Sequence, residues 1–95
     1  MFEILYTTKF KKDLKKIVKS KTNYQLVHTL LKTLEAEGVK GLDLHKNKPH
    51  RLIAQYKGNW ECHVKPDLLL IWDEYDEPTK QIILIRLGSH SELFD

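Results

Sequence analysis

The hydrophobic period of the chain changes once, close to Arg51. Before this point, apolar residues recur every three to four positions, as on one face of an amphipathic helix. After it, they alternate with polar residues or form short runs bounded by turn residues, as in β-strands. A chain that places helices first and a series of strands second predicts an α+β fold, with the helices packed on one sheet.

The first half is expected to form one strand and two helices. The first helix has an apolar stripe that includes Phe10 and Leu14, and lysines occupy most of its other positions. The second has a leucine-rich face, and Gly38 is a typical stop. The predicted segments are a strand over 2–7, a helix capped by Thr7 or Thr8, a helix that begins after Thr22-Asn23 and ends at Gly38, and a connecting loop over 39–49.

The second half is expected to form a meander, because short polar turns separate its apolar segments and such strands pair antiparallel. Residues 68–72 and 82–87 are apolar on both faces for much of their length, which predicts central strands. The predicted strands span residues 51–56, 60–65, 68–75 and 80–87. The expected architecture is α+β: an N-terminal strand and two helices packed on an antiparallel β-sheet, in a single domain over residues 1–95.

Length and composition exclude several classes of protein. Ninety-five residues form one domain, which is too small to enclose a large cofactor in a deep cavity. The longest apolar run, residues 68–72, is far shorter than the roughly 20 residues of a membrane-spanning helix, and the N-terminus lacks the features of a signal peptide. The single cysteine, Cys62, excludes an internal disulfide. We expect a soluble cytoplasmic protein, without membrane contact, in which Cys62 is an inert core residue.

Charge is distributed unevenly, although the net charge is only +3. Residues 1–22 carry a net charge of +5 and residues 40–66 of +4, whereas residues 67–95 carry −5. A basic surface of this kind attracts a polyanion such as RNA, with an affinity that falls steeply as salt is added. A solvated, lysine-rich helix face gives the same pattern, so charge alone does not define a partner.

Several polar residues lie in or beside the predicted strands. In the strand over 60–65, alternation turns Cys62 toward the helices and His63 toward the open face of the sheet. Asp67 follows at the end of this strand, and Arg86 ends the last one. Taken singly, each has a simpler explanation as a solvated, turn-forming or ion-paired residue.

Together, these residue types meet the requirements of RNA cleavage without a cofactor. Histidine can take a proton from a ribose 2′-hydroxyl or give one to the leaving 5′-oxygen. Arginine binds two phosphate oxygens at once, and an aspartate can orient a histidine or share the proton transfer. An aromatic ring can hold an unstacked base, at about 1–3 kcal/mol. The candidates are His50, His63, Asp67, Arg86, His90 and Phe94.

The same histidines and aspartate could also ligate zinc. No pair of histidines has the His-x-x-x-His spacing that places two ligands on one helical face, and a phosphate-binding Arg86 would repel a cation. We therefore expect neither a metal nor a cofactor.

Two blocks resemble the pattern of YafQ-type toxins, which belong to the RelE/ParE superfamily of bacterial toxin–antitoxin systems. Residues 61–71 are similar to the family block E-C-H-I-x-P-D-[WL]-L-L-[IV]-Y. Residues 86–94 are similar to its C-terminal signature R-x-G-[ST]-H-S-[DE]-L-F. Residues 50–52 resemble the family's D-H-x-L approach to the sheet, and the expected order of elements matches the family fold along the whole chain.

This resemblance implies a RelE-like fold and a ribosome-dependent mRNA endonuclease that a cognate antitoxin neutralises. Family members cut mRNA in the ribosomal A site by metal-free acid–base chemistry, through attack of the 2′-hydroxyl. Arg86 would then stabilise the phosphate, Phe94 would position a base, and the general base and general acid stay unassigned. Carried over position by position, the catalytic residues would be His50, His63, Asp67, Arg86 and His90, and the substrate-binding residues Phe94, Arg51 and Lys65.

Two positions depart from the family pattern. Trp60 stands where many members have an arginine, which implies either a lost RNA contact or stronger packing beside Cys62. Leu68 stands where many have a tryptophan, so a stacking surface is absent there. Neither departure removes a proton-transfer group.

Two other functions remain open at this point. One is a ParE-like inhibitor of DNA gyrase, since one fold hosts both activities. The other is a catalytically degenerate module that binds only antitoxin and operator. The partners expected from the resemblance are the antitoxin, in a hetero-oligomer, and the ribosome with A-site mRNA, and the toxin alone is expected to be a monomer.

Overall fold

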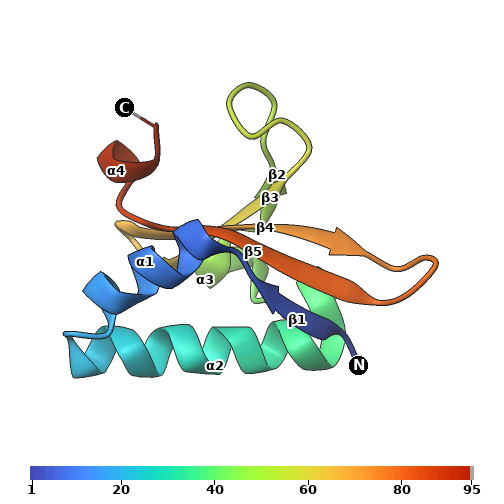
Figure 1. Cartoon of the computed structure of the whole chain (residues 1–95), viewed down its shortest axis with the longest axis horizontal. Coiled ribbons are helices and arrows are strands. Elements are labelled where there is room, and N and C mark those ends of the chain that lie inside the picture. The colour runs from blue at the N-terminus through green and yellow to red at the C-terminus, as the bar shows by residue number, and fades with distance from the viewer. Residues whose placement is uncertain (95) are drawn as a thin grey trace.

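A five-stranded sheet forms the centre of the computed structural model, which describes residues 1–94 (Figure 1). The strands lie in the order β1-β5-β4-β3-β2. The elements are β1 (Glu3–Tyr6), α1 (Thr8–Ile17), α2 (Lys21–Glu37), the 3₁₀ turn η1 (Gly38–Gly41), α3 (Leu44–Asn47), β2 (His50–Arg51), β3 (Trp60–Lys65), β4 (Leu68–Tyr75), β5 (Gln81–Gly88) and α4 (His90–Phe94).

The predicted α+β class and the antiparallel meander are confirmed. Strands β2 to β5 pair antiparallel in sequence order. The first strand differs, because β1 lies parallel to β5 and makes the sheet mixed. The chain leaves β1 through α1 and α2 and returns through β3 and β4, so that β5 comes to lie beside β1 in the same direction.

The two long helices begin at side-chain caps. Thr7 caps α1, as predicted, and its hydroxyl accepts from the N–H of Phe10 at 3.2 Å. The cap of α2 is Ser20, not Thr22 or Asn23, because the Ser20 hydroxyl accepts from the N–H of Asn23. Gly38 ends α2 with a φ of 70°, which favours glycine. Within residues 1–94, no helix combines the length and apolar character needed to cross a membrane.

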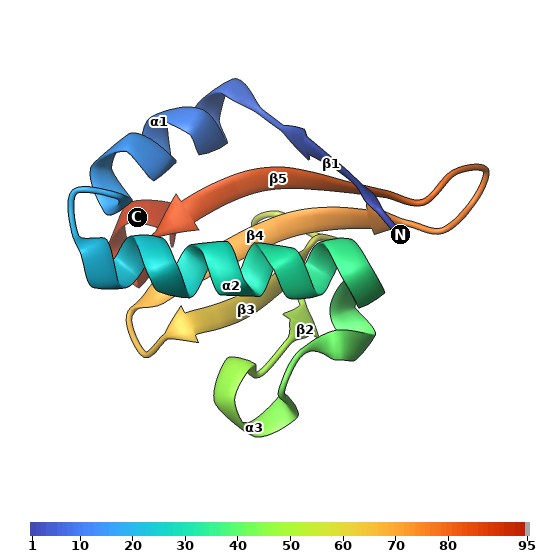
Figure 2. The ribbon, with the colours of Figure 1, turned by 90° about the horizontal axis from the view of Figure 1, so that it is seen from below.

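The main core fills the space between the sheet and the two long helices. Figure 2 shows α2 crossing this face of the sheet, and α1 packs along β5. Trp60, Cys62 and Val64 of β3 face this core, as the alternation predicts. The fully buried side chains of this core include Phe10, Leu34, Cys62, Leu70, Trp72, Ile82 and Leu84.

A second, smaller cluster covers the opposite face of the sheet. Its buried residues are Leu69 and Ile71 of β4 and Leu93 of α4. Four partly buried residues pack against them: Leu52, Tyr56, Ile85 and Phe94. In Figure 1, α4 and the loop before β3 stand on this side, away from α2.

The segment from residue 39 to 59 departs most from prediction. The predicted loop 39–49 contains η1 and α3, and the predicted strand 51–56 is reduced to the two residues of β2. After Arg51 the backbone closes on itself: Leu52 donates to the carbonyl of Asn59 and accepts from the N–H of Gly58, both at 2.9 Å. In this loop Leu52 packs against the second cluster.

The Cys62 thiol is expected to be unreactive in the folded chain. It is fully buried, and burial raises its pKa to about 12, so the reactive thiolate is disfavoured. Alkylation by iodoacetamide at pH 8.5 is expected to be slow without denaturant and fast in it, whereas an added Ser91→Cys thiol, on an exposed residue, reacts at once. Rapid native alkylation of Cys62 would contradict this placement.

Candidate active site

The strand register gathers several predicted residues on the face of the sheet opposite α2. His50 pairs with Glu61, Glu61 with Ile71, and Ile71 with Arg86, so these four residues form one row across four strands. Paired residues share a face of the sheet, and His63 joins them because it lies two positions along β3 from Glu61. Since Ile71 belongs to the second cluster, this row lies beside α4 and the 52–59 loop.

Arg86 is fixed by groups from two other segments. Its Nε and Nη2 donate to the carboxylate of Asp13 on α1 at 2.8 and 3.3 Å, and its Nη1 donates to Tyr56 Oη at 3.3 Å. Only 19% of the Arg86 side chain and 12% of the Asp13 side chain are exposed. The hydrogen bond to Asp13 is the main cause that raises the pKa of the Arg86 guanidinium above its ordinary value. Arg86 is therefore a permanent cation of fixed orientation.

His50 lies within hydrogen-bond distance of Glu61. Nδ1 of His50 lies 2.9 Å from the carbonyl oxygen of Lys48, which can only accept, so Nδ1 carries a hydrogen. Nε2 lies 3.1 Å from Oε1 of the buried Glu61. A hydrogen bond there needs a second proton, either on the ring or on the carboxyl group. The other carboxylate oxygen, Oε2, is buried and has no hydrogen-bond partner among residues 1–94. This pair has the composition of a proton-transfer group.

Helix α4 carries His90 and Phe94, and its start is fixed by a capping box. The N–H of Ser89 donates to Glu92 Oε1 at 2.8 Å, and the N–H of Glu92 donates to the Ser89 hydroxyl at 3.2 Å. Asp67, in the turn between β3 and β4, accepts from the N–H of His90 at 3.3 Å. Asp67 and His90 are thus neighbours, although 23 positions separate them in sequence.

The rings of Tyr56, Phe94 and His90 contact one another in this order. The His90 and Phe94 rings lie 4.9 Å apart, and Tyr56 meets Phe94 edge-on at 5.8 Å. Tyr56 has a φ of 63°, a conformation that bulky residues rarely adopt. Its contacts with Phe94 and Arg86 hold it there. Arg86 and the α4 residues are therefore linked through Tyr56.

His63 borders a basic hollow on the α3 side of the site. The hollow has a volume of about 200 Å³ and is lined by Lys46, Lys48, His63 and Pro66. The buried Asn47 fixes α3 here, because its side-chain amide donates to the carbonyl of His63 at 2.8 Å. The two lysines can attract a phosphate to the surface beside His63.

Arg51 and Lys65 do not join this arrangement. Arg51 pairs with Trp60, so it lies on the helix side of the sheet, with its guanidinium 4.8 Å above the Trp60 ring and Nη1 bonded to the Gly58 carbonyl. Lys65 is exposed at the end of β3, after a bulge that breaks the strict alternation beyond His63. Among residues 1–94, neither side chain forms a hydrogen bond or ion pair with the row that holds Arg86.

The two departures from the family pattern are packing residues here. Trp60 stacks on Trp72 with ring centroids 6.3 Å apart and packs against the main core. Leu68 is 3% exposed and belongs to the same core. Of the two explanations for Trp60, the structure therefore favours packing, and Leu68 offers no surface for a base.

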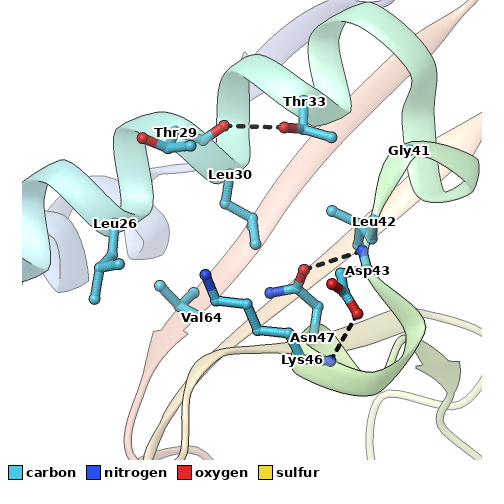
Figure 3. A pocket seen from close by; sticks show the side chains of 10 residues that line it. All are labelled: Leu26, Thr29, Leu30, Thr33, Gly41, Leu42, Asp43, Lys46, Asn47 and Val64. Atoms are coloured by element: carbon cyan, nitrogen blue, oxygen red, sulfur yellow. Dashed lines mark hydrogen bonds between the residues drawn. The ribbon is translucent and has the colours of Figure 1, made fainter.

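The hollow shown in Figure 3 lies elsewhere, between α2 and α3, and has a volume of about 280 Å³. Leu26, Leu30 and Val64 give it an apolar wall, and none of the predicted catalytic residues lines it. Within residues 1–94, no three His, Cys, Asp or Glu side chains are grouped closely enough to hold a metal ion. The predicted residues instead gather on the open face of the sheet.

Three residues of the arrangement were missed in the sequence. Asp13 is the only acidic residue of the lysine-rich α1, which is a weak signal. Glu61 lies within the block that resembles the toxin family, and its strand position predicted its face but not its burial. Tyr56 could not be identified from the sequence, because residues 51–56 were predicted to form a strand and not the loop that places Tyr56 beside Arg86.

Comparison with solved structures agrees with this fold. The chain superposes on YafQ from E. coli with a TM-score of 0.85 and 28% identity, over the whole of both chains. A metal-bound toxin from Helicobacter pylori gives a TM-score of 0.83 and 39% identity, over 99% of this chain and 100% of the other. The toxin in the E. coli DinJ-YafQ toxin-antitoxin complex gives a TM-score of 0.82 and 28% identity, over 99% of this chain and 98% of the other.

The family model that matches is that of the bacterial toxin of type II toxin-antitoxin systems, YafQ, and it covers residues 2–95. The chain therefore belongs to the YafQ family of type II toxins, and the resemblance found in residues 61–71 and 86–94 is confirmed.

The capping box is expected to make the order of α4 depend on pH. The hydrogen bond from the Ser89 N–H is the main cause that lowers the pKa of Glu92 below its ordinary value of 4.5. A lowered folded-state pKa adds stability above the unfolded value, and this is lost as pH falls through the folded value. The protection factor of the Leu93 amide against hydrogen exchange is therefore expected to fall on acidification below pH 4.5.

Two variants check the origin of this effect. Ser89→Ala is expected to lower the protection already at neutral pH, because the hydroxyl that accepts from Glu92 is lost. The matched Ser91→Ala, on an exposed residue of the same helix, is expected to change nothing. A Leu93 protection factor that stays constant down to pH 3 would rule out the capping box as the support of α4.

Proposed function

We propose that this chain is a ribosome-dependent mRNA endonuclease that works in the cytoplasm without a metal. The observation that carries the proposal is the fixed guanidinium of Arg86, which Tyr56 connects to the Phe94 ring and through it to the His90 ring. On one face of a small protein, Arg86 thus provides a rigid cation for a phosphate, His90 provides a titratable ring and Phe94 provides an aromatic surface. Membership of the YafQ toxin family supports the same activity.

The proposed reaction is an internal transesterification. A base removes the proton of the 2′-hydroxyl, and the 2′-oxygen attacks the adjacent phosphorus. The bond from phosphorus to the 5′-oxygen breaks, and an acid gives that oxygen a proton. The products are a 2′,3′-cyclic phosphate and a 5′-hydroxyl, and neither water nor a metal takes part in the bond changes.

The geometry supports a division of roles. Arg86 neutralises the charge that develops on the phosphate, in a fixed orientation. His50 with Glu61 holds an exchangeable proton at one end of the row, and His90 beside Asp67 offers a second titratable group. His63 lies on the same face as a further proton-transfer candidate. The Phe94 ring, which is partly exposed, stacks on a base of the substrate.

We also propose that a cognate antitoxin neutralises the toxin by forming a complex with it. The E. coli relative of this chain has been solved as a DinJ-YafQ complex, which supports such a partner. The free toxin is proposed to be a monomer. The basic segments 1–22 and 40–66 give a partner with acidic segments a complementary surface.

Substitution of His90 by glutamine tests the activity. His90 is exposed, so His90→Gln is expected to leave the fold intact while it lowers cleavage of translated mRNA by roughly 10²- to 10⁴-fold and relieves growth arrest. The matched control is His28→Gln, on α2, which is expected to remain toxic. Primer extension on a translated mRNA measures the cleavage.

Undiminished cleavage by His90→Gln would remove His90 from the catalytic set. Growth arrest with intact mRNA and accumulating DNA breaks would replace the endonuclease with a gyrase inhibitor. A wild-type chain that binds antitoxin but arrests nothing would indicate a degenerate module.

A further inference from the structure

A carboxylate from α1 holds Arg86 in place. Asp13 Oδ2 accepts from Arg86 Nε at 2.8 Å, and Oδ1 accepts from Nη2 at 3.3 Å. Oδ2 also accepts from the backbone N–H of Leu87 at 2.9 Å. We propose that Asp13 is the positioning residue for Arg86 in RNA cleavage, an inference that rests on the proposed function.

The donors of Arg86 show what the pairing leaves for a substrate. A guanidinium has five N–H bonds. Asp13 accepts hydrogen bonds from the Nε–H and from one N–H of Nη2, and Tyr56 Oη accepts from one N–H of Nη1. One N–H therefore remains on each of Nη1 and Nη2 to bind phosphate oxygens.

The setting of Asp13 argues for a dedicated role. It is the only acid of α1, among five lysines, and it is turned away from them onto β5. The other groups that act on the pair are Tyr56, which bonds Arg86, and Glu92, whose charge acts on Asp13; Glu92 gives the guanidinium no hydrogen bond among the described residues. Without Asp13, the long Arg86 side chain keeps only the neutral Tyr56 partner. The Arg86 guanidinium then samples many orientations.

The bond to Leu87 gives Asp13 a structural contribution as well. At this point β1 has ended, and two side chains bond β5 in its place: that of Thr7, the cap of α1, donates to the Leu84 carbonyl, and that of Asp13 in α1 accepts from the Leu87 N–H. A purely structural role would therefore lower stability without a specific effect on catalysis. The experiment has to separate the two roles.

The test compares Asp13→Asn, Arg86→Ala and the double variant in single-turnover cleavage of ribosome-bound mRNA. Misplacement of the guanidinium is expected to slow Asp13→Asn by roughly tenfold to a hundredfold. The ribosome concentration at half-saturation is expected to stay unchanged, because the lost interaction acts in the transition state. The double variant is expected to cleave as slowly as Arg86→Ala, because Asp13 affects catalysis only through Arg86.

Two controls sharpen the comparison. Asp73→Asn removes one charge from a partly buried carboxylate that bonds Asn59 rather than Arg86, and it is expected to cleave at the wild-type rate. Free guanidinium is expected to restore part of the cleavage to Arg86→Ala, but not to the double variant, because the Asp13 carboxylate is what binds the added cation.

Three outcomes would overturn the positioning role of Asp13, and a fourth would overturn the proposed function. Wild-type rates in Asp13→Asn, or a double variant slowed by the product of the two single effects, would overturn the positioning role and leave the endonuclease in place. Rescue of the double variant by guanidinium as strong as that of Arg86→Ala would overturn it too. A wild-type chain that cleaves no translated mRNA would overturn the proposed function, and this inference with it.

Discussion

The two central strands of the sheet are apolar on both faces, and most of the structure follows from this constraint. Leu70, Ile71 and Trp72 are fully buried in succession along β4, so both faces must be covered. The long helices cover one face. Among residues 1–94, the short α4 and the loop over 52–59 cover the other face, on which the row with Arg86 also lies. The candidate active site is therefore built around the smaller cluster.

Beside that cluster, Arg86 is a cation with little access to water, and it needs a partner. Asp13 supplies the opposite charge from α1 and Tyr56 supplies a neutral acceptor from the 52–59 loop. Tyr56 in turn contacts Phe94 of α4. One side chain thus connects the first helix, the last strand, the irregular loop and the last helix. The same contacts that stabilise the smaller face also orient the groups proposed to act on RNA.

The spacing of apolar residues was sufficient to predict the helices and strands in which that spacing is regular. The strands over 60–65 and 68–75 have the predicted limits, and Thr7 and Gly38 bound their helices as expected. Position on a strand was also sufficient to place His63 on the open face. The loop after Arg51 was not predictable, because its residues are β-prone and tertiary contacts override that preference. Nor was the pairing of Asp13 with Arg86, since 73 positions separate them and a lysine-rich helix gives no sign of its partner.

The central claim is that RNA is cleaved on the face of the sheet that α4 covers. A cryo-electron microscopy structure of the toxin on a ribosome, with mRNA methylated at the A-site 2′-oxygens to block cleavage, tests it most directly. The account predicts a backbone phosphate against Nη1 and Nη2 of Arg86, a base on the Phe94 ring, and Asp13 still paired with Nε. Messenger RNA bound along α2, with Arg86 remote from every phosphate, would contradict it.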